Sequence, residues 1–171
     1  MPHQARQRDS RVGPSKILFA LASALLMLAC IDAQAGPSCR PVNGNFTEQA
    51  FTQGCLSPVA LCLTGILSGV VRGTFETKVN TLTASADTPI TAAVSFTSDT
   101  VIHAQMGKLA GDVFIKNIGA YRTTGNGEII DLQIITGGTG GFAGVTGVVH
   151  TEGTFTAGVG SSDYVGSVCL P

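Results

Sequence analysis

The sequence is poor in charged residues and lacks the patterns of several large protein classes. Asp, Glu, Lys and Arg together make up 12% of its 171 residues. No run of Lys or Arg occurs, and this absence argues against nucleic acid as a partner. From Val59 onward no stretch is rich in Ala, Leu, Glu and Lys, so we expect strands rather than helices.

Motifs of common enzymes are missing as well. The chain contains no G-x-S-x-G nucleophile motif, no H-E-x-x-H metal motif and no Cys–His pairing, so hydrolase and metalloprotease activities are not supported. Cys55 and Cys62 lie seven residues apart with no His near them, which does not match the spacing of structural zinc sites. We expect no metal and no cofactor.

No apolar run is long enough to cross a bilayer as a helix. The run Ile17–Ala29 has 13 residues, whereas a membrane-spanning helix needs about 20. Four basic residues precede it and Ala33-Gln34-Ala35 follows it, which is the pattern of a secretory signal with an A-x-A cleavage site. Residues 1–35 are therefore predicted to be a signal peptide that is cut between Ala35 and Gly36.

Two alternatives stay open at this end of the chain. The apolar run could remain as a membrane anchor, although its length argues against this. Processing before Cys30 would give a lipoprotein, since the small residue Ala29 precedes that cysteine. In the preferred interpretation the protein is secreted or periplasmic and keeps no membrane span. Cleavage removes four of ten basic and two of eleven acidic residues, which leaves a net charge of −3.

Strands follow one another along the rest of the chain. In Gly69–Leu82, Val71, Phe75 and Val79 alternate with charged and polar residues, as in a strand with one apolar face. Ala92–Met106 has the same alternation. Five shorter strands are predicted at Leu61–Leu67, Gly111–Ile118, Glu128–Thr136, Gly147–Ala157 and Asp163–Leu170. Turn signals separate them at 87–89, at 124–127, after Thr136 and at 158–162. With no room for crossover helices, seven or eight such strands must pair antiparallel.

A glycine-rich stretch, GGTGGFAGVTG at 137–147, follows one of these strands. It contains a G-x-G-x-x-A match to the dinucleotide fingerprint, with Asp163 about 20 residues further on. That fingerprint requires a helix to begin at the glycines. The residues that follow are β-branched and alternating, so no helix is expected and dinucleotide binding is not supported.

The same stretch resembles the signature of the allene oxide cyclase and dirigent superfamily, in which G-G-T-G-x-F-x-x-A-x-G joins two late strands. Val145 stands where that pattern usually has alanine. The segments 55–65 and 164–169 are similar to parts of secreted bacterial proteins that carry such a barrel domain. The resemblance implies an eight-stranded antiparallel closed barrel with an apolar lumen, one end of which Phe142 plugs, and a homo-oligomer. We therefore expect an irregular, disulfide-tied entry segment at 36–57 and a barrel domain at 58–171.

The four cysteines that remain after cleavage are an even number, as expected of a chain oxidised outside the cytosol. Disulfides are favoured over a zinc site, and three pairings are possible. Because first and last strands adjoin in a closed barrel, Cys169 should lie near the entry segment. We prefer Cys55–Cys62 with Cys39–Cys169. The alternative is Cys62–Cys169 with Cys39–Cys55.

Three residues are candidates for acid–base chemistry. Asp131 lies in a segment that is apolar on both faces, and a carboxylate in an apolar lumen would have a raised pKa. His150 and Glu152 share one face of their strand and could act as a pair, although an exposed pair on the outside of the barrel is favoured. His103 is expected on the solvent side of its strand.

The expected function is to bind a small apolar ligand in the lumen of an exported barrel. One alternative is a cyclase-like or isomerase-like enzyme that acts on an unsaturated apolar substrate in the barrel. A second is a structural envelope protein with a filled lumen. Whether the protein is an enzyme stays open at this point.

Overall fold

The computed structural model describes residues 37–84 and 93–171. The predicted signal peptide, the cleavage site between Ala35 and Gly36, the alternative site at Cys30 and the turn expected at 87–89 lie outside these residues. Eight strands are present: β1 (Ser38–Phe51), β2 (Cys62–Gly69), β3 (Arg72–Ala84), β4 (Ala93–Met106), β5 (Leu109–Arg122), β6 (Glu128–Gly138), β7 (Thr146–Thr156) and β8 (Val159–Leu170). One short 3₁₀ helix, η1 (Gly140–Phe142), lies between β6 and β7. No helix among these residues has the length and apolarity to span a membrane.

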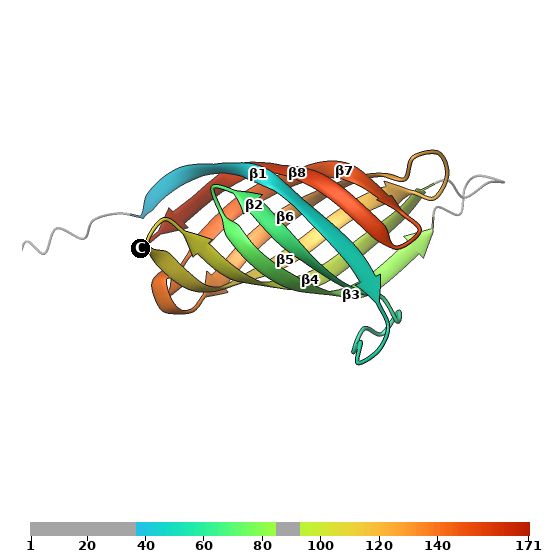
Figure 1. Ribbon diagram of the computed structural model, residues 1–171, viewed down its shortest axis with the longest axis horizontal. Coiled ribbons are helices and arrows are strands. Elements are labelled where there is room, and N and C mark those ends of the chain that lie inside the picture. The colour runs from blue at the N-terminus through green and yellow to red at the C-terminus, as the bar shows by residue number, and fades with distance from the viewer. Residues whose placement is uncertain (1–36, 85–92) are drawn as a thin grey trace, which may run out of the picture. The chain divides into compact units, whose positions relative to one another are not determined.

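The strands form one closed antiparallel barrel (Figure 1), in which each strand pairs with its neighbours in the sequence. The ring closes where β1 pairs with β8 in a register that places Ser38 opposite Leu170 and Gln49 opposite Val159. The predicted eight-stranded closed antiparallel barrel is therefore confirmed. A closed ring leaves no unpaired strand edge, which is how such proteins avoid edge-to-edge aggregation.

The alternation in the sequence places side chains on the two faces of the sheet as predicted. In β4, Phe96, Ile102 and Met106 are buried inside the barrel, whereas Ser95 and His103 are exposed outside. The same alternation runs through β3, where Phe75 and Val79 are buried. Because successive side chains in a strand point to opposite faces, apolar residues at every second position fill the lumen and their neighbours face solvent.

The segment 36–57 was expected to be irregular, and this expectation is wrong. Residues 38–51 form β1, a strand of 14 residues that pairs with both β2 and β8. Val42, Phe46 and Glu48 are its buried residues, so the alternation is present, but Pro41 and Gly44 conceal it. This strand exists because two partners hold its backbone, and one of the two pairings, that with β8, is not local in sequence.

A second correction concerns the last hairpin. The turn expected at 158–162 is shorter, since β8 already begins at Val159. Ala157 and Gly158 make the whole turn, with φ angles of 52° and 82°. Two consecutive residues with positive φ are the geometry of a tight two-residue hairpin whose twist matches that of the strands.

One end of the barrel is closed by the connection between β6 and β7. Phe142 in η1 is 1% exposed and Val145 is 0% exposed, and both belong to the core cluster with Met106, Val113 and Val168. The glycine-rich stretch therefore folds inward as a plug, as the resemblance implied for Phe142. It carries one short 3₁₀ turn instead of the long helix that a dinucleotide would require.

Several glycines face the lumen opposite large side chains. A Cβ at Gly65 would meet the Phe75 ring, and a Cβ at Gly160 would lie 2.7 Å from Glu48 Oε1. Gly160 and Glu48 are register partners on β8 and β1. Glycine at these positions makes room for a large neighbour in a narrow barrel.

Both preferred disulfides are present. Cys39 and Cys169 are register partners on β1 and β8 and form one bridge, while Cys55–Cys62 closes the loop between β1 and β2. The first bridge ties together the two strands that close the ring. Disulfides of this kind are typical of proteins from oxidising compartments.

Candidate binding site in the barrel lumen

The lumen is a narrow cavity lined by side chains from all eight strands and from η1. Its free space amounts to about 100 Å³. This is less than the ~300–1,000 Å³ of pockets for drug-sized ligands and close to the ~150 Å³ of an engineered apolar cavity that accepts benzene. The size of the cavity therefore suits a small ligand, such as a single ring or a short chain.

The two ends of the lumen differ. Near η1 the lining is apolar and buried, with Phe142 and Val42 at 1% exposed and Val168 at 5%. At the opposite end three aromatic rings follow one another: the Phe96 and Tyr121 centroids are 6.5 Å apart, and those of Tyr121 and Phe155 are 6.3 Å apart. Tyr121 and Phe155 are half-buried. The lumen is thus closed at the end near η1 and has an aromatic rim at the other.

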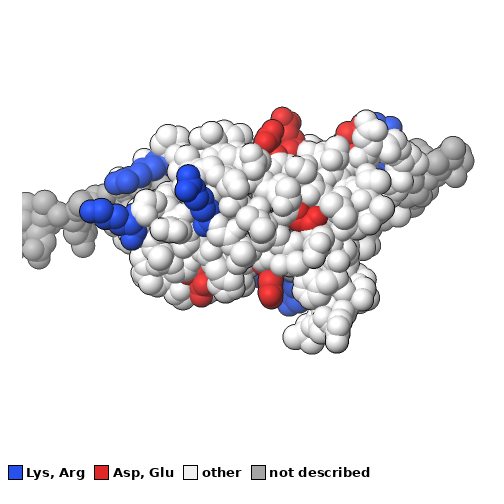
Figure 2. Space-filling model, in the orientation of Figure 1, with Lys and Arg blue, Asp and Glu red and all other residues white. Residues whose placement is uncertain are grey.

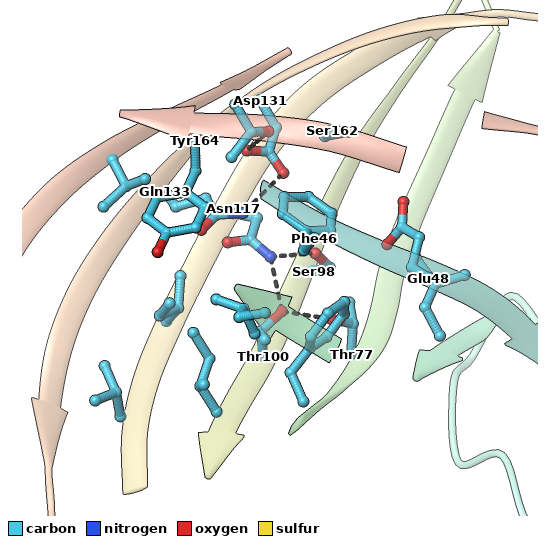
Figure 3. A pocket seen from close by; sticks show the side chains of 18 of the residues that line it. Phe46, Glu48, Thr77, Ser98, Thr100, Asn117, Asp131, Gln133, Ser162 and Tyr164 are labelled. Carbon is cyan, nitrogen blue, oxygen red and sulfur yellow. Dashed lines mark hydrogen bonds between the residues drawn. The ribbon is translucent and has the colours of Figure 1, made fainter. Parts of the chain in front are cut away.

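A belt of polar side chains circles the lumen between these ends (Figure 3). We call it the polar belt, and every strand except β2 contributes to it. Its members are Glu48, Thr77, Ser98, Thr100, Asn117, Asp131, Gln133, Thr151 and Ser162.

Hydrogen bonds join one part of the belt across β3, β4 and β5. The Thr77 and Thr100 hydroxyl oxygens are 2.6 Å apart. The Asn117 amide donates two hydrogen bonds of 2.9 Å each, one to Ser98 Oγ and one to Thr100 Oγ1. These bonds pair polar groups that the strand alternation places inside the barrel, in four of the nine residues of the polar belt.

Two polar atoms of the belt have no partner. Asn117 Oδ1 and Ser162 Oγ are buried and take part in no hydrogen bond with the described residues. Asn117 is 7% exposed and Ser162 is 4% exposed, and both line the cavity. Because a buried polar atom without a partner destabilises the folded protein, each of these atoms marks a place where a ligand group or a water molecule could bind.

Two carboxyl groups face the lumen, Glu48 from β1 and Asp131 from β6. Asp131 accepts a hydrogen bond of 2.7 Å from Thr151 Oγ1 and one of 3.5 Å from Gln133 Nε2. Burial raises the pKa of Asp131, while these two hydrogen bonds lower it. Among the described residues, none donates a hydrogen bond to the side-chain carboxyl group of Glu48.

Glu48 has the more strongly perturbed pKa of the two. Burial, and then the nearby charge of Asp131, raise the pKa of Glu48 from 4.5 to about 7. Asp131 has hydrogen bonds that stabilise its anion, and its negative charge helps to keep Glu48 protonated. The lumen therefore holds two carboxyl groups whose pKa values are both raised, and that of Glu48 lies close to neutral pH.

Tyr164 has a structural role in the wall of the lumen. Its hydroxyl donates a hydrogen bond of 3.0 Å to the Val71 carbonyl and accepts one of 3.1 Å from the Val71 amide. The ring packs against Gly44 and Gly69, where a Cβ would approach the Tyr164 hydroxyl. Tyr164 thus joins β8 to the turn between β2 and β3.

The predicted candidates divide between the two faces of the barrel. Asp131 lies in the lumen, as expected. His150 and Glu152 are exposed on the outside of β7, which is the location that was favoured for them. His103 is also outside, where its Nδ1 lies 2.7 Å from Asp112 Oδ1.

Glu48 is the functional candidate that sequence reasoning missed. Its segment was interpreted as irregular, so its side chain was assigned to no face. The signal was the alternation of Val42, Phe46 and Glu48, which is visible once the segment is treated as a strand. In the described residues no group of three or more His, Cys, Asp and Glu side chains could hold a metal ion.

Comparisons with known proteins identify no relative. No family model matches the chain, and neither a curated protein nor a solved structure matches it.

Proposed function

We propose that the protein is an exported barrel that binds a small apolar ligand in its lumen. The observation that carries this proposal is the cavity itself, which is closed at one end, has aromatic rings at the other and contains two polar atoms without partners. Concave, mostly apolar sites with a few convergent polar groups are the usual form of small-molecule sites. The two disulfides support export to an oxidising compartment.

The resemblance to the allene oxide cyclase and dirigent superfamily belongs to this proposal. The eight-stranded antiparallel barrel and the position of GGTGGFAGVTG between β6 and β7 support it. No functional residue of that superfamily is assigned to a position in this chain. The free space in the lumen argues against the alternative of a structural envelope protein with a filled lumen.

Native mass spectrometry of protein purified from its own host tests the proposal. The expected result is a protein peak with the added mass of a small molecule that is lost on unfolding. Ser162→Leu provides a matched variant, because leucine would occupy free space where the Ser162 hydroxyl has no partner. Ser161→Leu, on the outer face, is the control. Equal ligand occupancy in the wild type and Ser162→Leu would contradict binding in the lumen.

A cyclase-like or isomerase-like enzyme is the second candidate, and the two lumen carboxyl groups favour it. With the pKa of Glu48 near neutral pH and a second carboxyl group, Asp131, in the same lumen, one group could donate a proton and the other accept one. The test is to compare turnover of an identified substrate by the wild type and by Asp131→Asn. Unchanged turnover in Asp131→Asn would remove Asp131 as a catalytic residue.

A further inference from the structure

Among the residues that the structure describes, every charged side chain that lines the lumen is acidic. Glu48 and Asp131 are the charged lining residues, the other titratable ones are Tyr121 and Tyr164, and no Lys, Arg or His is among the described residues that line it. A ligand that carries a carboxylate would therefore meet like charge in a site shielded from water, without a cation to offset it.

Of the two unsatisfied atoms of the polar belt, Ser162 Oγ can donate or accept a hydrogen bond, and Asn117 Oδ1 has the same preference as the carboxyl groups. Asn117 Oδ1 can only accept a hydrogen bond, because it is a carbonyl oxygen. The Glu48 carboxylate, when ionised, also accepts and does not donate. Thus the free capacity of the belt is mainly acceptor capacity, and a ligand group with several N–H donors and a positive charge would satisfy it.

From this arrangement we propose that the lumen recognises a small apolar molecule carrying a protonated amine, whose ammonium group lies in the polar belt between Glu48, Asp131 and Asn117. This proposal rests on the proposed binding function and specifies its ligand class. The apolar part of the ligand packs against the aliphatic or aromatic lining, and the ammonium group exchanges water for two carboxyl groups and an amide oxygen. Charge-assisted hydrogen bonds of this kind are about twice as strong as neutral ones.

Binding of an amine would change the protonation of the site. An ammonium group beside Glu48 lowers the pKa of that carboxyl, which burial and Asp131 otherwise hold at about 7. At pH 7 the amine therefore displaces part of a proton from Glu48, and an uncharged ligand of the same shape does not. Proton release is thus a signature of this site that binding to the outer face would not produce.

Three probes that share one ring and differ in their polar group test the proposal: benzylamine, benzyl alcohol and benzoate. Titrations of the folded protein followed by two-dimensional NMR give the dissociation constants. We expect benzylamine to bind about tenfold or more tightly than benzyl alcohol, from the added strength of charge-assisted hydrogen bonds, and benzoate to show no saturation. Calorimetry in buffers of different ionisation enthalpy should detect proton release with benzylamine alone.

Variants of single acidic residues show which side chains bind the ammonium group. Glu48→Gln and Asp131→Asn should each weaken benzylamine binding about tenfold, the loss expected for one charge-assisted contact, and weaken binding of benzyl alcohol much less. Glu48→Gln should also abolish proton release. Glu152→Gln, an exposed acid on the outside of β7, is the matched control and should bind benzylamine like the wild type.

The outcomes separate the two proposals. Benzoate binding as tightly as benzylamine, or equal losses in Glu152→Gln and Glu48→Gln, would overturn the amine-specific site while the binding function stands. If none of the three probes binds and the protein carries no small molecule from its host, both proposals are wrong.

Discussion

The carboxyl groups inside the barrel and those outside it behave in opposite ways. Asp99, on the outer side of β4, accepts a hydrogen bond from Lys116 Nζ at 2.5 Å, and this contact is the largest cause that lowers the pKa of Asp99. Glu48 and Asp131 face the lumen, where burial raises their pKa values. Acids of similar intrinsic strength thus have raised pKa values inside the barrel and a lowered pKa at Asp99 outside it.

The difference shows that the face of the strand decides the chemistry of a residue in this barrel. Outside, a charge is solvated and scattered cations lie nearby, as Figure 2 shows for one side of the molecule, where charged side chains are few and separated by uncharged surface. Inside, water is limited and the described lining offers no cation. A shift of one residue in register would exchange the two environments.

The largest contrast between the faces should appear in stability. Phe75 is 5% exposed and its ring packs edge-on against Phe46, whereas Ile130 is 62% exposed on the outside of β6. We expect Phe75→Ala to lower the free energy of unfolding by about 3–5 kcal/mol and Ile130→Ala by less than ~0.5 kcal/mol, measured by urea denaturation. A loss above ~1 kcal/mol in Ile130→Ala that depends on protein concentration would indicate that the outer face is covered in the predicted homo-oligomer.

The second effect is a pH dependence of opposite sign to that of a surface acid. Glu48 binds its proton more tightly in the folded chain than in the unfolded one. Its contribution to the free energy of unfolding is therefore fully present below pH 4.5 and is lost as the pH rises to about 7. The expected loss is on the order of 3 kcal/mol, and Asp131 acts in the same direction. Glu48→Gln should flatten the curve between these pH values in thermal unfolding experiments. An unchanged slope in Glu48→Gln would show that another group is responsible, and Glu152→Gln is the control.

A smaller effect concerns the space beside Glu48. In Gly160→Ala the added Cβ would lie 2.7 Å from Glu48 Oε1 and 2.9 Å from Phe155 Cδ2, so we expect a loss of about 1–3 kcal/mol from overpacking. The outward-facing neighbour gives the comparison, since Ser161→Ala should be nearly neutral. In a Glu48→Ala background the cost of Gly160→Ala should fall, because the two residues are in contact. Additive losses in the double variant would contradict this explanation.

The smallest change in the free energy of unfolding is expected for Asp99 on the outer face. Asp99→Asn removes the ion pair with Lys116, and exposed pairs contribute about 0–1 kcal/mol. The stabilisation from Asp99 should depend on pH in the sense usual for a surface acid. Because the pKa of Asp99 is lowered in the folded chain, this stabilisation is present at neutral pH and is lost as the pH falls through that pKa. Comparison of acid unfolding curves of Asp99→Asn and the wild type measures it. A loss as large as that of a buried residue would show that the two faces differ less than proposed.

Much of the fold could be predicted because strand alternation is a local signal. The inward and outward faces of β3 and β4 follow from the alternation of apolar and polar residues. The segment around Asp131 is apolar on both faces, so the alternation left the face of Asp131 open and the barrel decided it. The closed ring that the resemblance implied favoured the pairing of Cys39 with Cys169 but left Cys62–Cys169 open, and the structure contains the preferred bridge. Glu48 could not be predicted in the same way, because prolines and glycines obscure its strand.

The sequence by itself determined which residues share a face, since the side-chain period of a strand is set by its backbone geometry. It also determined the antiparallel order of the strands, since short connections allow little else. The tertiary structure decided that residues 38–51 are a strand and that Glu48 shares a lumen with Asp131. Both depend on β1 pairing with β8, more than 100 residues later in the chain, and such a pairing has no local signal.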